Sequence, residues 1–370
     1  MKNSFFILLI FIFCTGCKKQ AATAEPLDIL EFKEVNRNVS IREAEERFFE
    51  APVYIRLKSA DKNTLFGRID QIKVLNGKIY ILDEGIKSLL VFDLDGNALG
   101  KVGVYGQGPQ EYLDIASFDV DTAGYIYTID GRNDKLFRYD DQFRCLSTQR
   151  LPFEADQIQL LADGRYLFAL SSWNMGECKG KKIAVTDRNL AVLASYLDYD
   201  EYKDDNYWIS GYQFIQTDRS ILYNQPIDNT IYRFSFNGEL QSSVRMDFGR
   251  QNTPDERKKD IERHLAEFDN YTLLRNFTVV TPQFLMGYVW EGRKNKVFLL
   301  DRASREIYVS RTLEDSDHTL LTGFCGSTMI SCIHPDAYEE DPDSDLLPED
   351  LIAHLKKGEF VICLRKIKKA

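Results

Sequence analysis

Hydrophobic and polar residues alternate in short runs along most of the chain. The stretch 76–102 shows the unit: a β-rich run, an apolar run and a turn at Asp95-Gly96-Asn97, which together predict three strands of a meander. The unit recurs along the chain. Each repeat is marked by the polar residue that follows its apolar run: Asp93, Asp140, Asp187, Ser235 and Asp301. The successive intervals are 47, 47, 48 and 66 residues. A period in the high forties with only strand and turn signals is typical of propeller blades.

Apolar runs in the third-strand position occur six times, at 89–92, 136–139, 183–186, 231–234, 297–300 and 361–364. The expected fold is therefore all-β, a six-bladed β-propeller of four-stranded antiparallel blades over residues 51–370. The longer fifth interval contains Thr253-Pro254-Asp255-Glu256, a capping box with proline at the first helical position. This motif predicts a short helical insertion before blade five.

The segment before the first repeat carries two further signals. Ser40 and Glu43 form a capping box, which predicts a short helix. The run 53–57 alternates as a strand, yet it precedes the innermost strand of the first blade. We expect it to pair with the C-terminal strand, 360–365, because this would close the ring without an exposed edge.

Turn signals divide the connections into two groups. Those joining first to second and third to fourth strands are tight, as at Asn76-Gly77 and Asn237-Gly238. Long segments fall between blades or between second and third strands: 103–112, 171–182, 198–208, 249–277 and 334–350. In a propeller the two groups lie on opposite faces, and insertions usually build the binding surface of a repeat protein. We call the face with the long connections the loop face and expect it to bind a ligand.

The first residues have the layout of a bacterial lipoprotein signal. Lys2 is followed by an apolar run over 5–13, too short to span a bilayer, and by Thr15-Gly16 before Cys17. This resembles a lipobox, in which Cys17 becomes the acylated first residue of the mature protein. We predict a signal peptide over 1–16, a tether and N-terminal segment over 17–50, and a protein lipid-anchored to the outer membrane of a bacterial envelope, on its periplasmic or its surface face.

Composition narrows the functional classes. The 370-residue chain is 44% hydrophobic, enough for a large core, and its net charge of −10 argues against nucleic-acid binding. Cys145, Cys178, Cys325, Cys332 and Cys363 have no C-x-x-C spacing, so buried thiols are expected, with one disulfide in the last blade as the alternative. The four histidines lack zinc-binding spacing, and no serine lies in a G-x-S-x-G elbow.

The repeats, together with the segment GQGPQEY at 106–112, resemble the six-bladed propeller lipoproteins of Bacteroides-type bacteria, which are related to NHL and TolB-like propellers. The resemblance covers residues 53–368. It implies the propeller fold and an envelope location, and it carries over no catalytic residue.

Candidate binding residues lie at the predicted loop face. Polar residues end the second strands, where they could line a channel mouth and hold a ligand or a divalent cation, or could simply cap turns. No cofactor is predicted. Aromatic residues in the long connections could stack on a sugar or a peptide, or pack within their own loops. The full candidate set is Asp83, Glu111, Tyr112, Asp130, Trp173, Trp208, Asn224, Trp290 and Glu291.

The expected function is therefore binding without catalysis. The ligand would be a glycan, a peptide or an envelope protein bound at the loop face. The alternative is a propeller lyase or lactonase-type enzyme with a polar or metal site at the channel mouth. A third possibility is a scaffold role, which would present an exposed apolar patch on a flat face.

Overall fold

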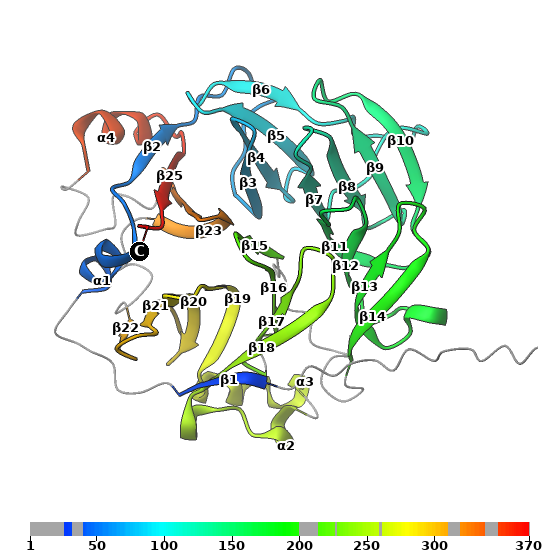
Figure 1. Cartoon of the computed structure of the whole chain (residues 1–370). Coiled ribbons are helices and arrows are strands. Elements are labelled where there is room, and N and C mark those ends of the chain that lie inside the picture. Colours follow the sequence, from blue (N-terminus) through cyan, green and yellow to red (C-terminus); the bar gives the residue numbers. More distant parts are fainter. Residues whose placement is uncertain are drawn as a thin grey trace, which may run out of the picture.

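The computed structural model describes residues 26–31, 40–199, 214–225, 228–258, 261–309, 319–336 and 347–369. Seen along the central axis, the sheets are arranged radially, with their inner strands around the middle (Figure 1). Cys17 and the predicted signal peptide lie outside the described residues, as do Trp208 and most of the acidic run at 336–345.

Four sheets have the four antiparallel strands of a propeller blade, with sequence neighbours paired. They are the β3–β6 blade (Gln71–Leu75, Lys78–Asp83, Ser88–Asp93, Ala98–Lys101), the β7–β10 blade (Ser117–Val120, Ile126–Asp130, Lys135–Tyr139, Cys145–Arg150), the β11–β14 blade (Ala155–Leu160, Tyr166–Leu170, Lys181–Thr186, Val192–Asp198) and the β19–β22 blade (Leu273–Val280, Phe284–Glu291, Lys294–Asp301, Ile307–Val309).

The other described strands form one nine-stranded sheet in the order β1-β18-β17-β16-β15-β23-β24-β25-β2. In chain order they are β1 (Pro26–Glu31), β2 (Val53–Arg56), β15 (Ile215–Thr217), β16 (Ile221–Gln225), β17 (Thr230–Phe234), β18 (Leu240–Asp247), β23 (Thr319–Gly326), β24 (Thr328–Ile333) and β25 (Val361–Lys366). The sheet is continuous because β15 pairs in parallel with β23, with Gln216 opposite Cys325 and Thr217 opposite Gly326.

The prediction of six four-stranded blades is therefore wrong. The described strands form four such blades, and the remaining strands merge into the nine-stranded sheet. The repeat pattern locates the strands well, but β15 and β23 are far apart in the sequence. Pairing between such distant strands leaves no local signal, whereas pairing between consecutive strands is the common case and was assumed throughout.

The expected pairing of the 53–57 run with the C-terminal strand is confirmed. β2 pairs antiparallel with β25 along its whole length. Just beyond β2, the N–H of Lys58 donates to the carbonyl of Gly96, at 2.7 Å, in the turn between β5 and β6. Gly96 has φ of +82°, and a Cβ there would lie 1.8 Å from the Arg56 carbonyl oxygen, so this contact requires glycine. The last strand and the first blade are thereby linked.

Two elements precede β2. Helix α1 (Ile41–Phe48) begins where the capping box predicted, with the Glu43 N–H bonded to the Ser40 hydroxyl at 3.2 Å and the Ser40 N–H bonded to the Glu43 carboxylate at 2.9 Å. The helix contacts β21 and β22, and an ion pair between Glu45 and Arg365 joins it to β25 of the nine-stranded sheet. Strand β1 lies parallel on β18 at the outer edge of the sheet and was not predicted (Figure 1).

Helices also occur in three connections. The insertion expected after Thr253 is present as η2 (Gly249–Gln251), α2 (Asp255–Lys258), α3 (Ile261–His264) and η3 (Leu265–Asn270), between β18 and β19. The short helix η1 (Gly176–Cys178) lies between β12 and β13, and α4 (Glu349–Leu355) precedes β25. The five cysteines from Cys145 onward form no disulfide with one another.

The hydrophobic core lies between neighbouring sheets. In the β3–β6 blade, Leu82, Leu89 and Val91 are fully buried against Phe118 and Phe137 of the next blade. Because both faces of a blade are covered, the middle strands read as continuous apolar runs, which is why these strands dominate the repeat pattern. The connections lie at the two ends of each blade, and their lengths distinguish the two faces.

Candidate binding face

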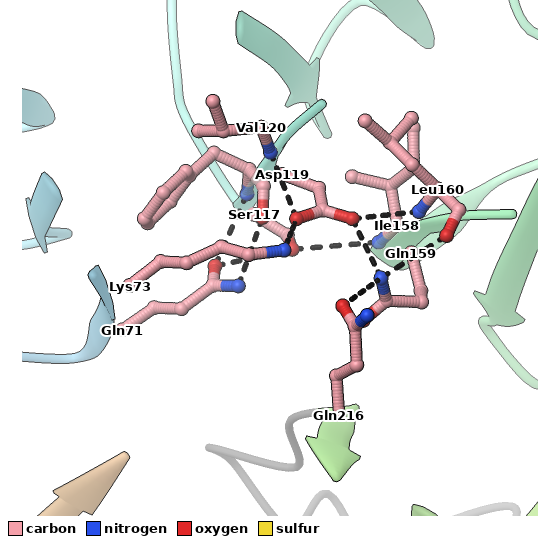
Figure 2. A network of polar contacts seen from close by, with 10 residues as sticks. Gln71, Lys73, Ser117, Asp119, Val120, Ile158, Gln159, Leu160 and Gln216 are labelled. Atoms are coloured by element: carbon pink, nitrogen blue, oxygen red, sulfur yellow. Dashed lines mark hydrogen bonds and ion pairs between the residues drawn. The ribbon is translucent and has the colours of Figure 1, made fainter. Parts of the chain in front are cut away.

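The inner strands place a polar network at the centre of the molecule (Figure 2). Lys73 of β3 forms an ion pair with Asp119 of β7, and both side chains are largely buried. The Asp119 carboxylate also accepts hydrogen bonds from the Leu160 N–H and the Gln159 side-chain amide of β11, each at 2.7 Å. The Gln159 amide in turn lies 3.3 Å from the side-chain oxygen of Gln216 in β15. The network thus connects four inner strands.

The charges of this network compensate one another. Burial by itself would lower the pKa of Lys73, but the Asp119 carboxylate beside it raises that pKa overall, so the lysine stays protonated. Burial raises the pKa of the nearby Cys325 thiol, against the opposing effect of Lys73. The cavity among these side chains has a volume of about 20 Å³, room for roughly one water molecule. This part of the channel is too small for a sugar or a peptide.

Two candidate acids at the ends of second strands accept backbone hydrogen bonds. Asp83, at the end of β4, is bonded by the N–H groups of Gly67 (2.9 Å) and Ile86 (3.1 Å). Asp130, at the end of β8, is bonded by those of Leu113 (2.8 Å) and Arg132 (3.0 Å). Both carboxylates are buried, so these contacts hold connections in place. Within the described part of the chain, no group of three or more His, Cys, Asp or Glu side chains is arranged to hold a metal ion.

The segment 106–112 folds around one of its own side chains. The Glu111 carboxylate accepts a hydrogen bond from the Gly108 N–H at 2.8 Å. A Cβ on Gly106 would lie 2.1 Å from the same carboxylate, so a larger residue there would displace the Glu111 side chain. The Gly106 N–H donates to the Tyr112 carbonyl at 3.0 Å, and Tyr112 is fully buried. The segment is a compact connection between blades, and the Tyr112 ring does not reach solvent.

The remaining candidates are spread over separate sheets. Asn224 is buried at the loop-face end of β16. Trp290 is half-buried beside the Arg275 guanidinium, which lies 5.7 Å from the ring centroid. Its neighbour Glu291 forms an ion pair with Lys296 at 2.5 Å. The structure therefore does not gather the predicted residues into one site.

Exposed apolar side chains, by contrast, concentrate on the loop face. Among the large hydrophobic residues exposed in the described chain, six lie in its connections: Leu65, Ile86, Val104, Tyr105, Trp173 and Met175. Five others lie on outer edge strands, and Leu94 lies in a tight turn of the opposite face. The distribution distinguishes the two faces, as the lengths of the connections did.

Trp173 and Met175, in the connection between β12 and β13, are 69% and 74% exposed. Asn174 between them is 6% exposed and points the other way. Its side-chain oxygen accepts from the Glu154 N–H at 2.8 Å, and its side-chain nitrogen donates to the carbonyls of Glu154 (2.7 Å) and Ser171 (2.9 Å). These three hydrogen bonds hold the connection against β11 while Trp173 and Met175 face outward. We call this the Trp173 loop.

A protein-family profile described as a domain of unknown function, DUF4934, matches residues 28–357. The chain belongs to this family. The match begins within β1 and ends just after α4, so it takes in all four blades of this DUF4934 protein. None of the described helices has the length and apolar character needed to cross a membrane.

The DUF4934 protein is also similar to solved structures. An exported protein of Bacteroides fragilis NCTC 9343 has a TM-score of 0.74 at 20% identity, over 92% of this chain and 100% of that chain. A member of the DUF4221 family from Bacteroides vulgatus ATCC 8482 has a TM-score of 0.54 at 12% identity, over 87% and 98%. At these identities the similarity shows the propeller-like fold. A comparison with curated proteins found no match.

Proposed function

We propose that this DUF4934 protein is a lipid-anchored envelope propeller that binds a glycan, a peptide or an envelope protein through its loop face, without catalysis. The observation that carries the proposal is the concentration of exposed apolar side chains on that face, above all Trp173 and Met175. Exposed apolar groups held in an ordered connection favour an interaction site, because contact with a partner removes them from water.

The other parts of the molecule support this choice of face. The centre of the channel is filled by the Lys73 network. On the opposite face, turns of neighbouring sheets are bonded to one another: Asn76 donates to the Thr122 carbonyl at 3.0 Å, and Arg165 donates to the Asn237 carbonyl at 2.9 Å. Those turns join sheets, whereas the Trp173 loop, on the other face, leaves Trp173 and Met175 exposed to solvent.

The test of the binding site is a screen of the protein against glycans and envelope proteins, followed by variants. Trp173→Ala should weaken binding by about 1–3 kcal/mol, the usual contribution of an aromatic anchor, and leave the thermal midpoint unchanged because its ring is exposed. Trp290→Ala tests the half-buried ring beside Arg275. Asn189→Ala, in a tight turn of the opposite face, is the matched control. Binding that is lost in Asn189→Ala and kept in both tryptophan variants would contradict the proposal.

The membrane anchor is tested separately, at Cys17. Each buried CH₂ of an acyl chain contributes about 0.8 kcal/mol, so the chains of a lipoprotein hold it firmly at a bilayer. Cys17→Ser should move the protein from the membrane fraction to the soluble fraction and remove the acyl mass, with ligand binding unchanged. A Cys17→Ser protein that still sediments with membranes, together with an unmodified wild-type mass, would refute the anchor.

A further inference from the structure

We propose that the Trp173 loop takes a basic peptide segment of another protein, in which an apolar side chain is flanked by lysine or arginine. This inference rests on the binding function proposed above and names the partner of the same face.

The anchor is already ordered. Trp173 and Met175 are exposed, while the buried Asn174 side chain between them makes three hydrogen bonds to the backbone of neighbouring segments. The buried Cys178 of η1 holds the far side of the connection. The backbone that carries the ring and the thioether is therefore already fixed, so the connection itself loses little conformational freedom on binding.

The residues next to this anchor are acidic. Glu154, whose backbone is bonded to Asn174, and Asp156, two residues further along, are both exposed at the start of β11. Glu177, two residues after Met175, is exposed in η1. Lys179 is exposed in the same connection, and Lys181, the first residue of β13, forms an ion pair with Asp198. Among these exposed residues, three carry a carboxylate, Glu154, Asp156 and Glu177, and one, Lys179, carries an ammonium group.

The carboxylates of Glu154, just before β11, and Asp156, in β11, also repel each other. Reduced hydration, and then the charge of Glu154, raise the pKa of Asp156 to about 6. A cation placed between Glu154 and Asp156 would relieve this repulsion, and a guanidinium or ammonium group would also be attracted to the face of the Trp173 ring. A neutral sugar gains nothing from the carboxylates, and an acidic partner is repelled by them. Charge complementarity therefore favours a basic segment.

The experiment uses the full-length protein in detergent and three probes. One is a short peptide with leucine and phenylalanine separated by arginines, the second has glutamates in place of the arginines, and the third is maltohexaose. The arginine peptide should bind at least about tenfold more tightly than the glutamate peptide at low salt, and the difference should shrink as salt is added. Binding is followed by fluorescence anisotropy of labelled probes.

Variants separate the charge from the anchor. Glu154→Gln combined with Asp156→Asn should weaken arginine-peptide binding about three- to tenfold at low salt, in the range of two exposed ion pairs. Trp173→Ala should weaken binding of the same peptide by about tenfold or more. Asp141→Asn removes an exposed carboxylate from the opposite face and should have no effect. Thermal midpoints of all variants verify that each is folded.

Several outcomes would overturn the proposal. They are equal binding of the arginine and glutamate peptides, no binding of the arginine peptide, an unaffected carboxylate double variant, or preferential binding of maltohexaose. If maltohexaose binds and its binding is lost in Trp173→Ala but kept in the carboxylate double variant, the basic partner is wrong and the loop-face function stands. If arginine-peptide binding is unaffected by Trp173→Ala, the Trp173 loop itself is not the site.

Discussion

At the scale of single residues, the ion pair between Lys73 and Asp119 shows how inner strands from separate sheets are held together. Neither charge is accessible enough for water to replace its partner, and Asp119 also accepts hydrogen bonds from β11. A buried charge that loses its partner is strongly destabilising, whereas an intact pair contributes modestly. Lys73 and Asp119 can therefore be buried without a large free-energy cost only when the inner strands pack so that the two charges meet.

Lys73→Met should consequently lower the free energy of unfolding by about 3–5 kcal/mol, because it leaves the Asp119 carboxylate buried without a cation. Urea unfolding followed by circular dichroism measures the change. Lys62→Met is the matched control, since Lys62 is exposed in the connection between β2 and β3. A loss below about 1 kcal/mol would mean that the N–H groups around Asp119 compensate its charge by themselves.

Glu84 makes the stability depend on pH. Partial burial, and then the neighbouring Asp70, raise its pKa to about 7; Asp114 and Asp83 add to the effect and Arg68 opposes it. The folded protein therefore binds a proton that the unfolded chain releases near the ordinary value of 4.5, so stability falls as the pH rises from 4.5 to about 7. Glu84→Gln should raise the thermal midpoint at about pH 8 and leave it unchanged near pH 4.5. The exposed Glu50→Gln is the control, and a midpoint gain for Glu84→Gln that is the same at both pH values would contradict this cause.

At the scale of elements, the sequence predicts those whose signal is local. Ser40 and Glu43 predict α1 because both partners of the capping box lie within one helical turn. The alternation over 53–57 predicts β2 and, with the closure argument, its partner β25. Strand β1 has no comparable signal, since its order depends on pairing with β18, more than two hundred residues away in the chain. Local patterns identify an element when its own residues carry the signal, as in α1 and β2, even where the strand that pairs with it is distant in the chain.

In the candidate site, too, the features with a local signal were predicted and those that depend on distant segments were not. Trp173 was predicted because a long connection with an aromatic residue is visible in the sequence, and its exposure is consistent with a binding role. The inward direction of Asn174 and the burial of Tyr112 depend on neighbouring segments, so the sequence could not show them. The Lys73 network was missed, although polar residues at alternate positions of the inner strands, such as Gln71 with Lys73 and Ser117 with Asp119, were available as a signal.

At the scale of the whole molecule, the repeat pattern predicted the propeller-like class and the two unlike faces but not how the sheets are joined. Counting repeats treats each unit as a separate blade, and the parallel pairing of β15 with β23 breaks that assumption. The junction satisfies backbone groups of two inner strands near the axis. One edge strand of the same sheet is β2, which precedes the first blade in the chain, and the other edge strand is β1. Both ends of the chain therefore contribute to one sheet.

The last prediction concerns this completion by β2. A chain that begins at Ser40 lacks β1 but keeps α1 and β2, and it should remain folded with a thermal midpoint near that of the full-length protein. A chain that begins at Ala60 lacks α1 as well as β2, leaves the edge of β25 unpaired and removes the buried Ile55 and Leu57. Burial of two such side chains contributes several kcal/mol, so the midpoint should fall by about 10 °C or the protein should aggregate through the open edge. Differential scanning calorimetry and light scattering distinguish these results. Equal midpoints for the two shortened chains would show that β2 is an addition to a sheet that is stable without it.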